Sequence, residues 1–237
     1  MIGTAETSLA IVAVSGLARE SRIAGGPCVR AIAAAGDWRH LSDLIEREVV
    51  RGARGIMSFG IAGGLAEDID AGTWLIGRAV VAGGERWPCD SAWADALAAR
   101  LPGAIAAEFA GVDVPLMHPA AKRALHRATG AAAVDNESHV AAAVAAKHGL
   151  PFAVFRVVAD SARRSLPPVA AVALTHEGKI RRTAVLRSLV GTPSQIPSVL
   201  RTAVDARRAF RALLRGRRRL GVGLAHPDLG DLLLDMP

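Results

Sequence analysis

The sequence predicts an α/β protein in which a mostly parallel or mixed sheet is flanked by helices. Apolar runs short enough to be strands buried on both faces alternate along the chain with segments of helical periodicity. That alternation is typical of sheets with helices packed on them. The 237 residues suffice for a full hydrophobic core and lie in the size range of single α/β domains. We therefore expect one domain over residues 1–220 and a tail over residues 221–237.

The first elements are expected to be two strands with a helix between them. Residues 9–14 form a continuous apolar run that a serine and a glycine close, as in a buried strand. Asp43 and Glu46 have the spacing of a capping box, so a helix is expected to begin there and to end near the next glycine. Residues 55–60 form the second strand, which runs into a glycine-rich turn over residues 61–65.

The middle of the chain continues the alternation. Residues 73–82 carry β-forming side chains and predict a strand. Residues 91–101 and 119–129 predict helices, the second with a proline in its first turn, where proline is tolerated. A brief strand over residues 132–134 then leads into a helix over residues 136–148, which a glycine and a nearby proline end.

Asp160 is the first candidate for chemistry. It ends the apolar run 152–159, which predicts a buried strand, and α/β sheets place ligands at the carboxyl ends of their strands. In the alternative interpretation Asp160 is a cap, or an ion-pair partner of Arg156 or Arg163.

Glu137 is the second candidate, because it lies in the first turn of its helix, where the helix dipole stabilises an anion. The alternative is a helix-start acid that only favours the N-terminus, with Asp135 as the actual cap. The glycines around Gly60 and Gly63 let backbone approach a ligand closely, but on this feature alone a tight strand-to-strand turn is the preferred interpretation. Together Glu137 and Asp160 could hold a small polar ligand between two acids.

The formal net charge of +7 is concentrated in an amphipathic helix expected over residues 198–220. Between Arg201 and Leu220 there are eight arginines and one acid, Asp205, so the rest of the chain is near neutral. An arginine-rich face suits peripheral contact with anionic headgroups at the inner membrane face, and a solvated helix packed on the domain is the alternative. Nucleic-acid binding is disfavoured because no aromatic stacking residues accompany the arginines in a basic patch.

Composition and motifs exclude several other classes. The two cysteines cannot form a disulfide framework, and neither they nor the histidines have the spacing of metal ligands. The chain has no G-x-G-x-x-G fingerprint, no P-loop and no G-x-S-x-G nucleophile elbow. No uncharged apolar stretch approaches the roughly 18 residues that a membrane span requires. We expect a cytoplasmic protein without a metal or an organic cofactor.

Three motifs occur in a recognisable order: SFGIAGGL at residues 58–65, AVDNES at 133–138 and RVVAD at 156–160. Together they resemble the ordered signatures of the purine nucleoside phosphorylase and methylthioadenosine/adenosylhomocysteine nucleosidase superfamily. The resemblance covers residues 9–160. It implies a three-layer α/β/α fold around a mixed, partly closed central sheet, and assembly into a homo-oligomer.

Within that superfamily the chain looks most like the hopanoid-associated phosphorylase branch. The segments that carry this likeness are residues 58–65, 137–139 and 164–168 and the arginine-rich terminal helix. The branch is linked to removal of adenine from adenosylhopane, so the resemblance implies a nucleoside-linked lipid as substrate. The alternatives are a methylthioadenosine/adenosylhomocysteine-type nucleosidase and a nucleoside-binding protein that has lost catalysis.

The resemblance also implies roles for individual residues. Asp160 would donate a proton to N7 of adenine, or share one with it, and the apolar strand around it is expected to raise its pKa. Glu137 would accept hydrogen bonds from the ribose hydroxyls. Gly60 and Gly63 would face the ribose and the nucleophile. Glu20, in the turn after the first strand, would orient water if the reaction is hydrolysis.

Three positions depart from the superfamily's pattern, and all three are expected to line the substrate site. Asn136 stands where Met usually packs against the ribose, Ile61 stands where nucleosidases commonly carry Ser, and Ala159 stands where many relatives have Ser before the catalytic Asp. Whether water or a phosphate co-substrate attacks is left open. Three arginines near turns are the candidates for an anion pocket: Arg19, Arg22 and Arg54.

Overall fold

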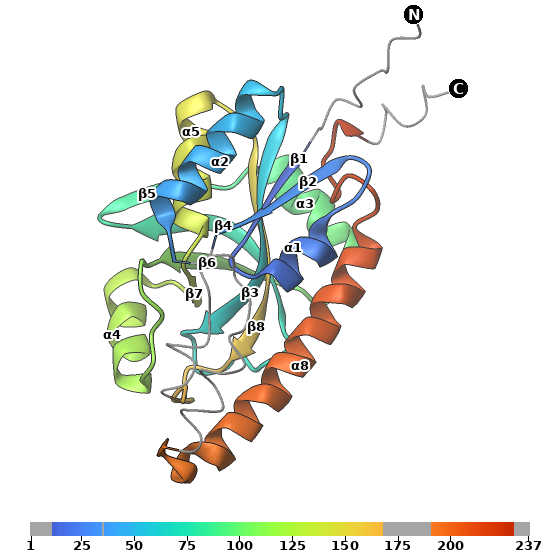
Figure 1. Ribbon diagram of the computed structural model, residues 1–237. Coiled ribbons are helices and arrows are strands. Elements are labelled where there is room, and N and C mark those ends of the chain that lie inside the picture. Colours follow the sequence, from blue (N-terminus) through green and yellow to red (C-terminus); the bar gives the residue numbers. More distant parts are fainter. Residues whose placement is uncertain (1–10, 35, 168–190, 230–237) are drawn as a thin grey trace, which may run out of the picture.

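The computed structural model describes residues 11–34, 36–167 and 191–229, and in these residues eight strands form one mixed sheet (Figure 1). The strands are β1 (Ile11–Ser15), β2 (Val29–Ala33), β3 (Gly55–Gly64), β4 (Trp74–Ala82), β5 (Glu85–Pro88), β6 (Ile105–Gly111), β7 (Ala133–Asp135) and β8 (Phe152–Asp160). The helices are α1 (Ala18–Ala24), α2 (Trp38–Val50), α3 (Ser91–Arg100), α4 (Pro119–Thr129), α5 (Ser138–His148) and α8 (Ile196–Arg219), the last preceded by the short 3-10 helix Pro193–Gln195.

Part of the sheet closes on itself. Its order is β2-β1-β3-β7-β6-β4-β5, and β8 pairs with both β3 and β4. Strands β3, β7, β6, β4 and β8 therefore form a closed five-stranded ring, whereas β1, β2 and β5 extend it outward. The expectation of a mixed, partly closed sheet is confirmed.

Closure depends on the length of β3. The sequence predicted a turn over residues 61–65, and this is wrong, because the strand continues to Gly64. Its first part runs parallel to β1 and β8, and its last residues, Gly63 and Gly64, pair antiparallel with Val134 and Ala133 of β7. Without side chains these two glycines let the strand pass close to its neighbours, so a segment that resembled a turn joins the two halves of the sheet.

Helices cover both faces of the sheet (Figure 1). The helices α2 and α5 pack together on one face, and α1, α3 and α8 pack on the other. Strand β8 is buried on both faces. Val154 and Val158 point into the core on the side of α2 and α5, whereas Phe155 and Val157 point into the core on the side of α1, α3 and α8. That explains its continuous apolar run. The three-layer α/β/α prediction is confirmed.

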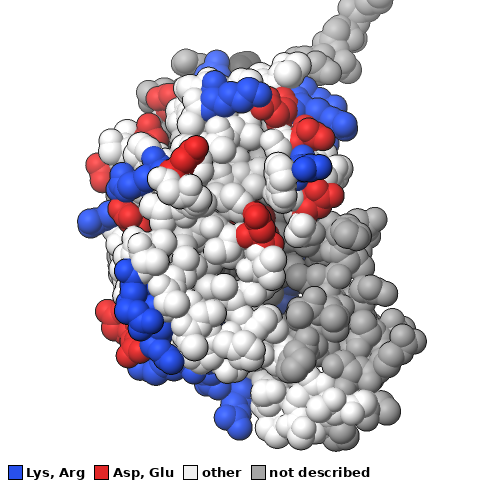
Figure 2. Space-filling view, turned by 90° about the vertical axis from the view of Figure 1, so that its left-hand side faces the viewer, with Lys and Arg blue, Asp and Glu red and all other residues white. Residues whose placement is uncertain are grey.

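The charge on the surface is mixed on the face that lies to the left in Figure 1. There, Lys and Arg are interspersed with Asp and Glu at the edge, and the middle of the described surface is mostly uncharged (Figure 2). The basic excess of the sequence is therefore not spread over this face.

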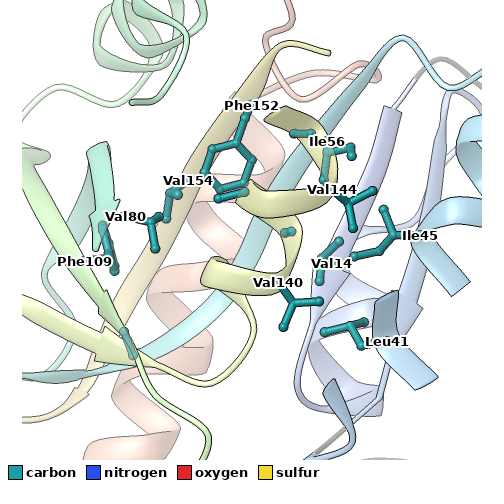
Figure 3. Packing of buried hydrophobic residues seen from close by; sticks show 14 of the residues in the cluster. Val14, Leu41, Ile45, Ile56, Val80, Phe109, Val140, Val144, Phe152 and Val154 are labelled. Atoms are coloured by element: carbon teal, nitrogen blue, oxygen red, sulfur yellow. The ribbon is translucent and has the colours of Figure 1, made fainter. Parts of the chain in front are cut away.

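The core between the sheet and the pair α2 and α5 is shown in Figure 3. Leu41 and Ile45 of α2 and Val140 and Val144 of α5 meet side chains of β1, β3 and β8 there. Because Leu41 lies on the buried face of α2, the helix has to begin before residue 43. Its N-cap is Asp37, whose Oδ1 accepts a hydrogen bond from the amide of His40 at 2.9 Å. The capping box expected at Asp43 is wrong, because Asp43 is an exposed residue inside the helix.

Four elements were not anticipated from the sequence, namely α1, β2, β5 and β6. Three of these elements are short or partly exposed, so the spacing of their apolar residues gives only a weak signal. Strand β2 alternates only partly between buried and exposed positions, β5 has four residues and α1 has seven. The first residues of the predicted strand 9–14 and residues 230–237 of the predicted tail lie outside the described residues.

The C-terminal helix packs on the domain through Phe210 and Leu213. The chain after it does not leave the domain at once: Leu224 and Leu229 are buried, and the carbonyl of Leu224 accepts from the indole Nε1 of Trp93 at 2.9 Å. Residues 221–229, expected to belong to a tail, thus contribute to the core, because Leu224 and Leu229 join the buried cluster that contains Trp93 and Leu97 of α3.

Gly216 gives a test of this packing. A Cβ at this position would lie 2.4 Å from Cζ of Phe155 in β8, so α8 approaches the sheet only because the residue has no side chain. Gly216→Ala is expected to lower the free energy of unfolding by about 1–3 kcal/mol, despite the better helix propensity of alanine. Denaturant unfolding measures this change. Gly25→Ala is the matched control, since a Cβ there makes only ordinary contacts, and equal stability of the two variants would contradict the prediction.

Candidate active site

A cavity of about 380 Å³ opens where the carboxyl ends of β3 and β8, the start of α1 and the junction of β7 with α5 converge. Seven of the eight residues that the sequence analysis singled out lie in its wall: Glu20, Ile61, Gly63, Asn136, Glu137, Ala159 and Asp160. These residues come from segments far apart in the chain, and the closed ring of strands brings them together. Gly60 lies behind the wall, under the Glu20 carboxylate, which a Cβ at Gly60 would approach to 2.6 Å.

Arg156 lines the cavity and is 1% exposed. Its Nε donates to Ser58 Oγ at 2.9 Å, its Nη1 donates to the carbonyl of Ile61 at 2.8 Å, and its Nη2 donates to Glu137 Oε2 at 3.1 Å. Its Nε also lies 3.3 Å from Asp135 Oδ2. The guanidinium is thus a buried cation shared by two carboxylates, and it is not the partner of Asp160.

Glu137 occupies the N-cap position of α5 without a capping hydrogen bond of its own, and the side chain of Asp135 caps the helix start instead, as the alternative interpretation of Glu137 expected. Its Oδ1 accepts from the amides of Glu137 at 2.9 Å and Ser138 at 2.7 Å, and its Oδ2 accepts from Ser138 Oγ at 2.6 Å. Because Asp135 satisfies these helix-start groups, the Glu137 side chain is left to face the cavity and Arg156.

The environment of Glu137 favours its protonated form. Burial raises the pKa of Glu137 to about 7, the positive charge of Arg156 opposes this rise, and the negative charges of Asp135 and Glu20 add to it. Three acids around one cation cannot all be ionised at low cost in a buried site. Glu137 therefore changes its protonation near neutral pH.

Glu20 comes from α1, a helix that the sequence analysis did not anticipate, and it is 1% exposed. Its Oε1 accepts from the amide of Ile61 and its Oε2 accepts from the amide of Leu17, each at 2.7 Å. Burial raises the pKa of Glu20, and Arg156 and these backbone amides oppose the rise. The two hydrogen bonds hold the carboxylate rigidly between the first and third strands, where it lines the cavity.

Asp160 lies on the cavity wall beside a residue that the sequence analysis missed, Lys122 of α4. The Lys122 ammonium donates to Asp160 Oδ2 and to the carbonyls of Ser161 at 3.0 Å and Arg164 at 3.3 Å. Burial raises the pKa of the Asp160 carboxyl, as expected from its apolar strand, and Lys122 opposes that rise. Arg156 is not the partner of Asp160, since it contacts Asp135 and Glu137 instead. Arg163 is not its partner either, since it lies 3.6 Å from Asp70.

The three positions that depart from the superfamily's pattern all line the cavity. The orientation of the Asn136 side chain is fixed by a hydrogen bond, because its Nδ2 donates to the carbonyl of Val112 at 2.8 Å. Ile61 contributes its amide to Glu20 and its carbonyl to Arg156, so its backbone serves the site although its side chain is apolar. A β-bulge in the pairing of β8 with β3 places Ala159 and Asp160 opposite Gly63, and this allows both neighbours to line the wall.

No group of three His, Cys, Asp or Glu side chains in residues 11–34, 36–167 and 191–229 is arranged to hold a metal ion. Four of the lining acids instead contact Arg156, Lys122 or backbone amides, and Asp113 lies 3.2 Å from Nε2 of His139. The cavity is therefore lined by opposed charges and apolar side chains.

The raised pKa of Glu137 predicts a pH dependence of stability. Between its ordinary value of 4.5 and about 7, the folded protein holds this proton more tightly than the unfolded chain does. The stability that the group contributes is therefore fully present below pH 4.5 and is lost as the pH rises through about 7. Denaturant unfolding over this range should show a shallower loss of stability in Glu137→Gln. The exposed control Glu67→Gln should follow the wild type, and an unchanged slope in Glu137→Gln would contradict the assignment.

Comparison with known proteins agrees with this architecture. The family model of the phosphorylase superfamily matches residues 10–190. The structure resembles the 5′-methylthioadenosine/S-adenosylhomocysteine nucleosidase of Helicobacter pylori solved with butyl-thio-DADMe-Immucillin-A, with a TM-score of 0.60 and 15% identity over 90% of this chain and 99% of that chain. The corresponding nucleosidase of Streptococcus pneumoniae, with the transition-state inhibitor MT-ImmA, gives a TM-score of 0.60 and 14% identity over 89% and 99%.

A third neighbour is the futalosine hydrolase of H. pylori, with a TM-score of 0.57 and 15% identity over 89% of this chain and 97% of that chain. Comparison with curated proteins finds no match. At these identities the solved structures establish the fold, and the family model, which spans most of the sequence, establishes the relationship. The chain belongs to the phosphorylase superfamily.

Proposed function

We propose that the protein cleaves the N-glycosidic bond of a purine nucleoside with water as the attacking group. The observation that carries this proposal is a single cavity in which Glu20, Glu137 and Arg156 face Asp160 and Lys122. The family relationship supports the same reaction class, since two of its structural neighbours are named nucleosidases and another is named a hydrolase.

The distribution of charge suits the chemistry of this bond. Its cleavage develops positive charge on the ribose and negative charge on the departing base. Glu20, Asp135 and Glu137 surround one cation, Arg156, so one side of the cavity stabilises a cationic ribosyl group. Asp160, on the other side, is the group that we assign to the base. Glu137 then accepts hydrogen bonds from the ribose hydroxyls.

Water is favoured over phosphate because the lining cations are already paired. Of the described lining residues only Arg156 and Lys122 are cationic, and both contact carboxylates. None of the three arginines considered for an anion pocket lines the cavity: Arg19, Arg22 and Arg54. Arg19 lies over the ring of Phe210 instead, 4.2 Å from its centroid. A phosphate dianion would enter a site rich in carboxyl groups, whereas a water can donate to Glu20 and be oriented by it.

We further propose adenine as the base and a nucleoside-linked lipid of the adenosylhopane type as the substrate. Adenine presents an acceptor at N7 and a donor at its exocyclic amine, and a carboxyl group that can take up or release a proton matches this pair. The likeness of the sequence to the hopanoid-associated branch supports the lipid. A methylthioadenosine-type nucleosidase is the alternative substrate assignment, and a nucleoside-binding protein without catalysis is the alternative to an enzyme.

Asp160→Asn tests the reaction. The variant keeps the shape of the side chain but cannot give up a carboxyl proton, so purine release should fall by about a hundredfold to ten-thousandfold. Chromatography of the released base, with and without phosphate, measures this, and a sugar product with an anomeric hydroxyl in place of a 1-phosphate identifies hydrolysis. The exposed Asp68→Asn is the control. Equal rates in wild type and Asp160→Asn would remove Asp160 as the acid, and tight binding of a nucleoside without any release would favour the non-catalytic alternative.

The outer face of α8 supports contact with a membrane surface. It carries exposed apolar residues, among them Leu200 at 62% and Val204 at 57% exposure, on the same side as Arg207 and Arg211. Such a face suits the boundary between headgroups and acyl chains, and we propose that the protein is cytoplasmic and binds the inner membrane face peripherally through it. Among the described helices, none has the length and apolar character needed to span a bilayer. Assembly into a homo-oligomer stays a prediction that light scattering can measure.

Vesicle co-sedimentation tests the contact. Because Phe210 and Leu213 of α8 belong to the core, substitutions are better suited than truncation. Replacing Leu200 and Val204 together by Gln should reduce sedimentation with vesicles containing phosphatidylglycerol, since apolar burial in the bilayer is lost while the arginines remain. Val50→Gln, exposed on α2, is the control. Failure of the wild-type protein to sediment with these vesicles would contradict the membrane proposal, and dimerisation through this face would point to a second copy as its partner.

A further inference from the structure

Lys122 is a buried cation that the reaction described above does not use. It is 1% exposed and is the buried residue of α4, a helix whose other side chains are exposed or half-buried. An ammonium is costly to remove from water unless it is paired, and an apolar side chain could fill the same space more cheaply. Of the 29 basic residues of this chain only three are lysines, so a lysine in this wall stands out.

The contacts of Lys122 fix its position and that of its neighbours. Its ammonium has three donors, and three oxygens surround it: Asp160 Oδ2 and the carbonyls of Ser161 and Arg164. All three acceptors belong to the end of β8 and the loop that follows it. The side chain therefore ties α4 to the segment that carries Asp160, and it sets the direction of the carboxyl group at the cavity wall.

A carboxylate beside an ammonium differs from an isolated carboxylic acid. An ionised carboxylate only accepts hydrogen bonds, so the proton for a departing base has to belong to the pair as a whole. The other charged groups near Asp160 do not replace Lys122: Asp205 of α8 repels it, and Arg164 lies 3.6 Å from Asp205. The neighbouring strand β3 faces Asp160 with the backbone of Gly63.

We propose that Lys122 and Asp160 act as one proton-donating pair for the departing purine, in which Asp160 contacts the base and Lys122 is the positioning residue that orients it and resupplies its proton. This inference rests on the proposed function. In the step, the C1′–N9 bond breaks and its electron pair stays on the purine, while N7 takes a proton from Asp160. Lys122 passes a proton to Asp160, leaving a neutral amine. Water adds to C1′ and gives its proton to Glu20. After the products leave, Glu20 releases this proton to solvent and Lys122 takes one up from solvent, so both groups return to their starting state.

The experiment compares two leaving groups in the wild type and in Lys122→Met. A purine nucleoside requires a proton on its leaving group, whereas 4-nitrophenyl riboside releases a stable phenolate without one. The kcat/KM for adenosine should fall by about a hundredfold in Lys122→Met, while that for 4-nitrophenyl riboside should stay near the wild-type value. Lys122→Arg keeps a cation that can orient Asp160, but a guanidinium does not give up a proton, so this variant should recover only the part of the activity on adenosine that orientation contributes. The exposed Lys147→Met is the matched control and should resemble the wild type on both substrates.

The outcomes separate this inference from the proposed function. If Lys122→Met loses activity equally on both substrates, Lys122 is only structural, and if it loses none on adenosine, Lys122 does not supply the acid; either result overturns the inference. If the wild type cleaves neither substrate, the proposed function fails first. Infrared spectra of the Asp160 carboxyl then still test the pair, because removal of the ammonium should raise the pKa of Asp160 further. An unshifted carboxyl band in Lys122→Met and in Lys122→Gln would overturn it.

Discussion

The buried guanidinium of Arg156 holds together the segments that form one side of the cavity. It joins β8 to β3 through Ser58 and Ile61 and to the start of α5 through Glu137 and Asp135. Removing one partner of such a buried cluster leaves an uncompensated charge, at a cost of about 3–5 kcal/mol. The cluster contains more acid than base, so the site retains a tendency to hold protons or to attract positive charge. That imbalance makes the site suited to a ribosyl cation.

An ion pair between Lys122 and Asp160 lines the same cavity. Its surroundings differ from those of the Arg156 cluster. Arg156 is shared by acids that exceed it in number, whereas Lys122 meets one carboxylate and two backbone carbonyls. In the proposed reaction the Arg156 cluster stabilises charge on the sugar and the Lys122 pair supplies a proton to the base, so each group matches the charge that develops beside it.

Closure of the sheet places these two pairs at one site. The extension of β3 through Gly63 and Gly64 allows it to pair with both β7 and β8, and the ends of these strands carry Asp135 and Asp160. In an open sheet the strand that ends in Asp135 would have no reason to lie near β8. The long helix α8 packs against β8 and has exposed apolar residues, Leu200 and Val204, on its outer face, so one element contributes to the core and to the surface proposed to meet a membrane.

Much of the fold and part of the candidate site could be predicted from the sequence alone. Continuous apolar runs and regular helical spacing predicted β1, β8, α3, α4 and α5 closely, and three ordered motifs indicated the superfamily. The acids Glu137 and Asp160 could be singled out because a helix start and a strand end are local features. Weakly patterned elements such as β2 and β6 were missed, since partly exposed strands lack a strong period.

Only the tertiary structure decided which charges meet. Lys122 lies 38 residues before Asp160, and Glu20 accepts from the amide of Ile61 41 residues away. Pairing at such separations depends on how helices dock on a closed sheet, and no local pattern encodes it. The same is true of the extended β3, because a run of glycines reads as a turn until neighbouring strands provide its hydrogen-bond partners.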